Sequence, residues 1–228
     1  MRVAVLYTGG KDSTYAMHRA IQQGREVVCL ITLKPESQSS FMFHSANINW
    51  VKDLQAKALG VPMIFKKTKG VKGDDLKDLK AALQMAIKKY NIDGVVFGAN
   101  ASEYQRYRIE AACADLGLRT IVPLWHIDPA KYMSDFINDG FETIFVSVAA
   151  EGLNQGWLGR KYDLQALEDL KILHAKFGIN IGGEGNEFET FVINGPIFKK
   201  RIEIIEAEKI WKDEHGIYDI KKAKLAKK

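Results

Sequence analysis

The chain has 228 residues, a net charge of +5 and an apolar fraction of 46%. These values are typical of a soluble globular protein with one large domain or two small ones. No apolar run approaches the ~20 residues that a membrane-spanning helix needs. The N-terminus carries no signal-peptide or transit-peptide pattern. We therefore expect a cytoplasmic protein that makes no contact with a membrane.

The positive charge is concentrated at the C-terminus. Residues 221–228 contain five lysines and no acidic residue, and without them the basic and acidic residues number 28 each. Such a stretch usually forms a solvated helix end or a disordered arm. A second basic group, predicted to lie in a loop, consists of Lys66, Lys67, Lys69 and Lys72. Because the body of the chain is neutral, nucleic-acid binding is not favoured.

The two cysteines, Cys29 and Cys113, lie far apart in the sequence and form no C-x-x-C pattern. A disulfide framework, a zinc site and an iron–sulfur cluster are therefore not indicated. Cys29 falls in a predicted buried strand and Cys113 on the apolar face of a predicted helix. We expect neither thiol to be a nucleophile.

The first motif, Thr8-Gly9-Gly10-Lys11-Asp12-Ser13, lies between a predicted strand (Arg2–Tyr7) and a predicted helix (Ser13 to about Gln23). Two glycines let the backbone turn tightly and approach a ligand closely. The helix directs its N–H groups and the positive end of its dipole at the same place. Lys11 adds a full positive charge. The motif therefore favours phosphate, although it is neither a Walker A loop nor a dinucleotide-binding fingerprint. The alternative is a glycine turn that binds nothing.

Strands and helices alternate through residue 122. After the first helix the pattern predicts strands at 26–33, 61–66, 94–98 and 119–122, and helices at 48–59, 75–89 and 103–116. This alternation predicts an α/β fold with a doubly wound, parallel five-stranded sheet. Ligands of such sheets bind outside the carboxyl ends of the strands, where we place the loops at 8–13, 33–44 and 98–104.

The alternation is lost from Pro123 onward. The pattern there predicts helices at 129–138 and 163–177 and strands at 143–149, 189–193 and 202–211. We expect a smaller C-terminal α+β domain. The predicted organisation is a nucleotide-binding domain at 1–122, an acceptor domain at 123–220 and a basic tail at 221–228.

Three further clusters contain residues able to carry chemistry. Glu184, Glu187 and Glu189 lie in a glycine-rich turn before a strand, where grouped acids repel one another unless a cation lies among them. The alternative is a solvated acidic turn. The start of a predicted helix holds Glu103, Tyr104, Arg106, Arg108 and Glu110. Arginine suits the recognition of oxyanions, and the alternative is an ordinary charged helix face. The third cluster, Phe41–His44, is aromatic, and His44 fits a structural role or a functional one.

Together these blocks resemble the diphthine–ammonia ligase family, a branch of the N-type ATP pyrophosphatases. The resemblance covers residues 1 to about 202. It rests on TGGKDS at 8–13, FMFH at 41–44, EYQR at 103–106 with Arg108 and Glu110, Leu124-Trp125, Ala149-Ala150, Gly152-Leu153, Leu158-Gly159 and GEGNEFET at 183–190. Asn186 stands where the family pattern usually has glycine.

The resemblance implies an AMP-forming ligase that uses ATP and Mg²⁺. Its substrate would be diphthine, a modified histidine of translation elongation factor 2 that carries a carboxylate and a trimethylammonium group. ATP would adenylate the carboxylate and release pyrophosphate. Ammonia would then attack the acyl-adenylate to give diphthamide and AMP. The expected partners are elongation factor 2 and ammonium, and the sequence leaves homo-oligomerisation open.

The resemblance also implies roles for individual residues. The residues expected to bind ATP are Thr8, Gly9, Gly10, Lys11, Asp12, Ser13, Thr32, Leu33 and Gly98. The residues expected to take part in catalysis are Lys11, Asp12, Glu184, Glu187 and Glu189, with Asp12 also as the ligand of Mg²⁺. The residues expected to contact the substrate are His44, Glu103, Tyr104, Arg106 and Arg108.

Two alternative functions remain open. The first is an ATP pyrophosphatase that modifies tRNA, and the lack of C-x-x-C and the neutral body argue against it. The second is a non-catalytic module that binds an adenine nucleotide. The intact Lys11-Asp12-Ser13 sequence and the full second domain argue against that module.

Overall fold

The computed structural model describes residues 1–35, 47–68 and 74–228. These residues form two compact units. The first unit comprises Met1–Thr8 and Asp12–His126, and the second comprises Gly9–Lys11 and Ile127–Lys228. Within the described ranges, no helix is both long and apolar enough to span a bilayer.

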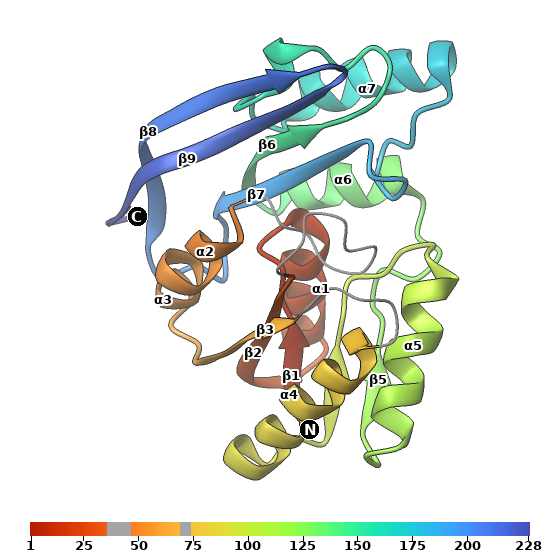
Figure 1. Ribbon diagram of the computed structural model, residues 1–228, viewed down its shortest axis with the longest axis vertical. Coiled ribbons are helices and arrows are strands. Elements are labelled where there is room, and N and C mark those ends of the chain that lie inside the picture. The colour runs from red at the N-terminus through yellow and green to blue at the C-terminus, as the bar shows by residue number, and fades with distance from the viewer. Residues whose placement is uncertain (36–46, 69–73) are drawn as a thin grey trace. The chain divides into compact units, whose positions relative to one another are not determined.

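A parallel sheet of five strands forms the centre of the first unit (Figure 1). Its strands are β1 (Arg2–Leu6), β2 (Glu26–Pro35), β3 (Met63–Thr68), β4 (Gly94–Val96) and β5 (Arg119–Ile121). Their order is β3-β2-β1-β4-β5, and every neighbouring pair is parallel. The predicted doubly wound topology is therefore confirmed. The strand order reverses between β1 and β4, which is where ligands bind in folds of this type.

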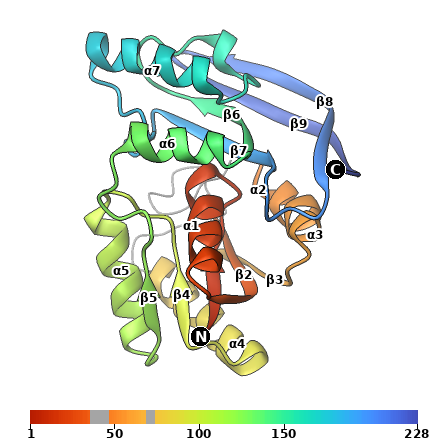
Figure 2. The same ribbon diagram turned by 180° about the vertical axis from the view of Figure 1, so that it is seen from behind.

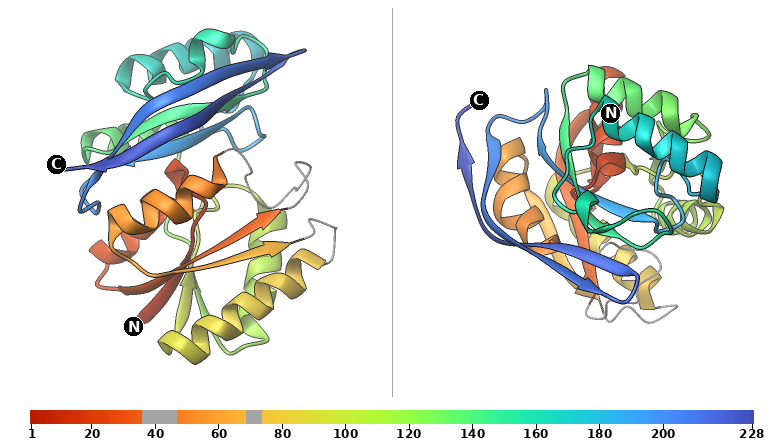
Figure 3. Two further views of the ribbon diagram at one scale, coloured as in Figure 1. Left: turned by 60° about the vertical axis from the view of Figure 1, so that its left-hand side comes forward. Right: turned by 90° about the horizontal axis from the view of Figure 1, so that it is seen from above.

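Helices cover both faces of this sheet (Figure 3, left). On one face lie α1 (Lys11–Gln22) and a second helix made of α2 (Ile48–Trp50), a π-helical segment (Val51–Gln55) and α3 (Ala56–Leu59). On the other face lie α4 (Asp74–Tyr90) and α5 (Glu103–Ala114), which pack on a core that includes Leu83, Val95, Phe97 and Cys113. The sequence predicted one helix at 48–59, and it did not predict that the middle of this helix, Val51–Gln55, is π-helical. Because both faces are covered, the central strands are nearly continuous apolar runs.

The second unit contains an antiparallel sheet with the strand order β7-β6-β9-β8. The strands are β6 (Glu142–Val148), β7 (Phe188–Asn194), β8 (Arg201–Lys212) and β9 (His215–Ala226). Two helices, α6 (Pro129–Asn138) and α7 (Leu164–Phe177), lie along one face of it (Figure 2). Phe145 stands at the centre of this core, because its ring packs against Tyr162, Trp157 and Phe188 at centroid distances of 4.9, 5.1 and 5.0 Å. The expected α+β architecture of the C-terminal part is confirmed.

The strand β9 corrects the interpretation of the lysine-rich C-terminus. Residues 221–226 are neither a helix end nor a disordered arm, because they form the second half of β9. The opposing strand β8 is rich in glutamate, and Lys224 lies opposite Glu203 and bonds to it at 3.2 Å. Lys221 reaches Glu208 at 3.3 Å. Opposite charges on facing strands favour pairing, so the charge of the lysines is compensated locally by acids on β8.

The second basic group also differs from expectation. Lys66 and Lys67 belong to β3 rather than to a loop, and Lys66 forms an ion pair with Asp78 at 2.9 Å. Lys69 and Lys72 lie outside the described residues, as does the aromatic patch at 41–44.

Candidate functional site

The loop between β1 and α1 has the geometry that its residues predict. Gly9 has a φ of 84°, in the left-handed region that glycine enters without steric cost. The backbone N–H of Thr8 donates to Ser13 Oγ at 3.2 Å. The hydroxyl oxygens of Thr8 and Ser13 lie 3.3 Å apart. The structure therefore brings the two predicted hydroxyl groups together at the start of α1.

Gly98, which follows β4, supports this loop from the neighbouring strand. A Cβ atom at Gly98 would lie 2.5 Å from the carbonyl carbon of Asp12 and 2.8 Å from the backbone nitrogen of Ser13. The first turn of α1 therefore packs directly on the backbone after β4, at the switch point of the sheet. Only a residue without a side chain allows this approach. Gly98 therefore lies against the loop, while its contact with a nucleotide stays a prediction.

A buried hydrogen-bond network lies next to the loop. Thr14 Oγ1 donates to the Tyr7 hydroxyl at 3.1 Å, and Thr32 Oγ1 donates to the Tyr7 carbonyl at 2.6 Å. All three residues are buried. Burial raises the pKa of Tyr7, so its phenol stays neutral. The hydroxyl of Thr32 thus ties β2 to the end of β1, while contacts of the Thr32 and Leu33 backbone with adenine stay a prediction. Sequence reasoning missed Tyr7 as a member of this network, because the fold rather than a local pattern joins it to Thr32.

The segment Gly9–Lys11 belongs to the second unit and contacts its strand β7 and helix α6. The Gly9 carbonyl accepts a hydrogen bond from the Val192 N–H at 3.0 Å. The Lys11 N–H donates to Thr190 Oγ1 at 3.0 Å. The ammonium of Lys11 lies 5.7 Å from the ring centroids of both Tyr132 and Phe188, distances at which aromatic rings attract a cation. Lys11 is 3% exposed, so its charge is held in a largely dehydrated environment.

The acidic turn before β7 is closed by one of its own carboxylates. Glu187 Oε1 accepts the Asn180 N–H at 3.0 Å, and Oε2 accepts the Gly185 N–H at 2.8 Å. Glu184 and Glu189, the other two predicted acids, are half-buried. Asn186 has a φ of 66°, in the left-handed region that asparagine tolerates better than most residues. Asparagine in place of glycine therefore preserves the turn.

The predicted substrate-binding residues of α5 are partly engaged with one another. Ser102 caps the helix by accepting the Gln105 N–H at 3.4 Å. Arg106 pairs with Glu110 at 2.7 Å, and its guanidinium lies 4.4 Å from the ring centroid of Trp125. Glu110, one turn further along α5, is therefore the acid with which Arg106 pairs.

Tyr104 lies at the exposed start of α5. Its ring faces the guanidinium of Arg108 at 5.2 Å, and the residue is 43% exposed. Glu103 is also exposed, whereas Arg108 is half-buried. His44, the remaining predicted substrate contact, lies outside the described residues.

The loop residues fit the phosphates of a nucleotide. The first turn of α1 is compact at the switch point. Gly9 adopts a left-handed φ, the Thr8 and Ser13 hydroxyls lie side by side, and Gly98 packs closely on the backbone. Asp12 is the carboxylate of this loop and is half-buried. Within the described ranges, no group of three or more His, Cys, Asp or Glu side chains is arranged to hold a metal ion. Mg²⁺ commonly binds through one or two carboxylates together with phosphate oxygens, and Asp12 suits that pattern.

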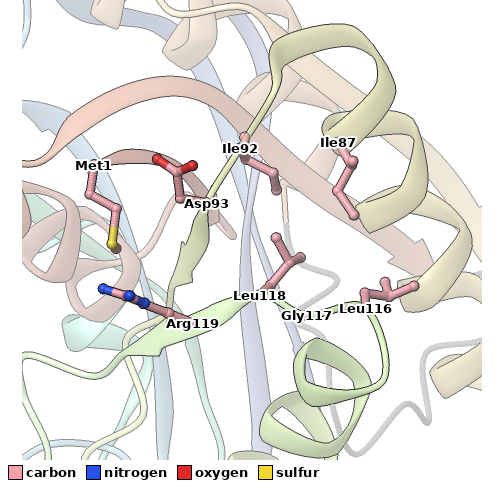
Figure 4. A pocket seen from close by; sticks show the side chains of 8 residues that line it. All are labelled: Met1, Ile87, Ile92, Asp93, Leu116, Gly117, Leu118 and Arg119. Atoms are coloured by element: carbon pink, nitrogen blue, oxygen red, sulfur yellow. The ribbon is translucent and has the colours of Figure 1, made fainter.

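A cavity of about 450 Å³ lies at the opposite edge of the parallel sheet (Figure 4). It is lined by Met1, Ile87, Ile92, Asp93, Leu116, Gly117, Leu118 and Arg119. Met1 precedes β1, and Asp93 precedes β4. Asp93 accepts the Arg2 N–H at 2.8 Å. Because nucleotides bind at the carboxyl ends of the strands in this fold, this cavity is not the nucleotide site.

The two cysteines are inert by environment. Burial raises the pKa of the Cys29 and Cys113 thiols to about 12, and both residues are fully buried. The thiolate is the nucleophilic form of cysteine. Neither thiol therefore has the properties of a nucleophile, as the sequence predicts.

The comparisons with known proteins cover nearly the whole chain. The family model of the diphthamide synthase N-terminal domain matches residues 1–120, and that of the C-terminal domain matches residues 128–226. The diphthine–ammonia ligase of Danio rerio is 35% identical over 91% of this chain and 87% of its own length. The human protein of the same name is 33% identical over 91% of this chain and 84% of its own. The Schizosaccharomyces pombe protein is 34% identical over 91% of this chain but only 37% of its own. The chain therefore belongs to the diphthamide synthase family, and it is a ligase.

Proposed function

We propose that this protein is a diphthine–ammonia ligase that uses ATP to amidate diphthine on translation elongation factor 2. The observation that carries this proposal is the match of both family domains, in order, over nearly the whole chain. Two relatives named diphthine–ammonia ligase are 35% and 33% identical to this chain over 91% of its length. The phosphate-type loop at the switch point of the parallel sheet agrees with a nucleotide-dependent reaction.

The reaction proceeds in two steps, adenylation and amide formation. An oxygen of the diphthine carboxylate attacks the α-phosphorus of ATP, the bond from that phosphorus to the β-phosphate oxygen breaks, and pyrophosphate leaves. The nitrogen of ammonia then attacks the acyl carbon, and the proton that it loses passes to the solvent. The carbon–oxygen bond of the acyl-adenylate breaks, and AMP leaves with its electron pair. The products are the amide, AMP and pyrophosphate.

The first step needs positive charge and donors around the phosphates. Lys11 and the N-terminus of α1 supply positive charge where negative charge accumulates in the transition state. Thr8 and Ser13 supply hydroxyl groups, and the two glycines let the phosphates approach the backbone. Mg²⁺ would bind at Asp12 and would neutralise part of the phosphate charge.

The second step needs groups that orient the acceptor and the ammonia. Glu184 and Glu189 are the acids of the turn suited to an ammonium or a quaternary amine. We assign Glu187 to the same site because its carboxylate accepts two backbone N–H groups and thereby fixes the turn that carries the other two acids. The proposed contacts of α5 with the acceptor are Glu103, Tyr104, Arg106 and Arg108. His44 stays a further proposed contact.

The proposal is tested by the nucleotide products. The protein is incubated with ATP, Mg²⁺, ammonium and elongation factor 2 that carries diphthine, and AMP and pyrophosphate are quantified. We expect both products in a one-to-one ratio with the amide, and none when elongation factor 2 carries an unmodified histidine. Lys11→Ala serves as the variant expected to lose adenylation. Formation of ADP, or AMP formation that ignores the acceptor, would contradict the proposal.

A further inference from the structure

A single hydroxyl group connects the two most distinctive motifs of the sequence. Thr190 is the last residue of GEGNEFET, and its Oγ1 accepts the backbone N–H of Lys11, the lysine of TGGKDS, at 3.0 Å. The two residues are 179 positions apart in the sequence. Two residues further along β7, the Val192 N–H donates to the Gly9 carbonyl at 3.0 Å. Both ends of the Gly9–Lys11 segment are thus bonded to β7.

The position of β7 in its sheet explains how it can bind this segment. β7 is at one end of the strand order β7-β6-β9-β8, so the sheet pairs only one of its backbone edges, with β6. Side chains alternate along a strand, which places Phe188 and Thr190 on the same face. The Phe188 ring lies 5.7 Å from Lys11 Nζ. One face of β7 therefore contacts both the backbone and the ammonium of Lys11.

The contact requires a side-chain atom that accepts a hydrogen bond. A backbone N–H at the start of a helix has no partner within the helix and commonly bonds a side-chain oxygen or a ligand. Thr190 supplies such an oxygen, and its branched Cβ restricts χ1 so that the oxygen is held in place. Serine preserves the acceptor, whereas valine preserves the branched shape and removes it.

We propose that Thr190 is a positioning residue of the phosphate loop, whose hydroxyl fixes the backbone of Lys11 in the conformation that adenylation needs. This inference rests on the proposed function, because it assigns Lys11 to the phosphates of ATP. Thr190 acts through Lys11 and touches neither the nucleotide nor the acceptor. The GEGNEFET motif then contributes to the ATP step by its threonine, in addition to any role of its acids in the second step.

The chain offers a matched control. Thr143 lies on β6, directly opposite Val192 of β7, and is 1% exposed. Within the described residues its Oγ1 has no hydrogen-bond partner. Thr143→Val therefore makes the same chemical change as Thr190→Val, in the same sheet and at greater burial, without removing a hydrogen bond.

The test compares the wild-type protein with Thr190→Val, Thr190→Ser and Thr143→Val. Acceptor-dependent AMP formation gives kcat and KM for ATP, calorimetry gives the affinity for a non-hydrolysable ATP analogue, and thermal unfolding gives stability. We expect Thr190→Val to lose about fivefold to tenfold in kcat/KM and in analogue affinity. We expect both Thr190→Ser and Thr143→Val to remain close to the wild type in kcat/KM and in analogue affinity.

The outcomes separate this inference from the proposed function. Equal kcat/KM and equal analogue affinity for Thr190→Val and Thr143→Val would overturn the role of Thr190, even when the ligase activity is real. Absence of AMP from the wild-type protein would overturn the proposed function, and the analogue affinities would still decide for or against Thr190. If Thr190→Val does not fold, hydrogen exchange of the wild-type Lys11 N–H replaces it as the test. Slow exchange together with full activity of Thr190→Ser would support the role of Thr190. Fast exchange would overturn it.

Discussion

A Cβ atom on Gly98 would lie 2.5 Å from the carbonyl carbon of Asp12 and 2.6 Å from its carbonyl oxygen. Both atoms belong to the backbone of the first turn of α1, so neither can move aside as the end of a side chain would. The loop after β1 and the residue after β4 are therefore matched in shape at the switch point.

Gly98→Ala should displace the first turn of α1 and weaken ATP binding by at least about tenfold. Overpacking of this kind also costs about 1–3 kcal/mol of folding stability. Calorimetry with an ATP analogue and chemical denaturation measure the two effects. Gly117→Ala is the control, since Gly117 has a φ of 67° and, among the described residues, nothing lies within 4 Å of its missing Cβ. It should lose stability through backbone strain but keep its ATP affinity. Unchanged ATP affinity in Gly98→Ala would refute the close packing as a determinant of the loop.

Glu187→Ala should loosen the acidic turn, because it removes the acceptors of two backbone N–H groups at 3.0 and 2.8 Å. Each bond to a charged group contributes about 1.5–3 kcal/mol. We expect faster hydrogen exchange at the Asn180 and Gly185 amides and slower amide formation, with ATP binding retained. Glu187→Gln, which keeps one acceptor oxygen, should fall between wild type and alanine.

Glu151→Ala is a suitable control for this experiment, because Glu151 is an exposed acid outside the turn. It should leave the exchange of both amides unchanged. If the Asn180 and Gly185 amides exchange equally fast in the wild-type protein and in Glu187→Ala, the carboxylate does not hold the turn.

The thiols of Cys29 and Cys113 should be unreactive in the native protein. Burial raises their pKa to about 12, so the thiolate fraction near neutral pH is very small. A thiol reagent should react slowly with the folded protein and label both residues rapidly in denaturant. The Cys29→Ala and Cys113→Ala variants should retain amide formation with ammonium. Rapid labelling of the folded chain, or loss of activity in a folded variant, would contradict this prediction.

Glu142 should contribute stability that depends on pH. The Asn194 amide donates to Glu142 Oε1 at 2.8 Å and lowers the pKa of its carboxyl, and Lys161 at 3.1 Å also lowers it. Because the folded pKa lies below the unfolded value of about 4.3, the contribution is present above that value and is lost as the pH falls through the folded pKa. Glu142→Gln should therefore be less stable than wild type near neutral pH, and the difference should shrink on acidification.

Denaturant unfolding at several pH values measures this difference. Glu168→Gln is the control. Glu168 pairs with Lys171, but its side chain is 61% exposed, and exposed pairs contribute about 0–1 kcal/mol. A Glu142→Gln difference that does not change with pH would show that the carboxylate contributes nothing through its charge.

Local signals in the sequence predicted much of the fold. The helix at 129–138 was predicted with its bounds, because Asp128 caps it by accepting the Lys131 N–H at 2.7 Å and Pro129 opens its first turn. The central strands were predicted because their apolar runs are continuous, as in Val3–Val5. In each case the determining interaction lies within a few residues.

The features that were missed depend on partners far apart in the chain. The lysines of β9 indicate a tail when considered alone, and only their pairing with the glutamates of β8 makes them a strand. Thr190 and Tyr7 carry no local pattern, because their hydrogen bonds are made across the fold. Glu187 is a different case, because its carboxylate accepts backbone N–H groups only two and seven residues away, and its predicted part in catalysis stays a prediction. A single sequence shows which residue types are present but not which of them the fold engages.

The central claim is tested most directly by the nitrogen that enters the acceptor. Elongation factor 2 that carries diphthine is incubated with the protein, ATP, Mg²⁺ and isotopically labelled ammonium, and the peptide that contains the modified histidine is analysed by mass spectrometry. We predict the incorporation of one labelled nitrogen per peptide, at the former carboxylate, only when ATP is present. A peptide that stays unlabelled, or one whose nitrogen comes from the amide of glutamine instead, would contradict the account.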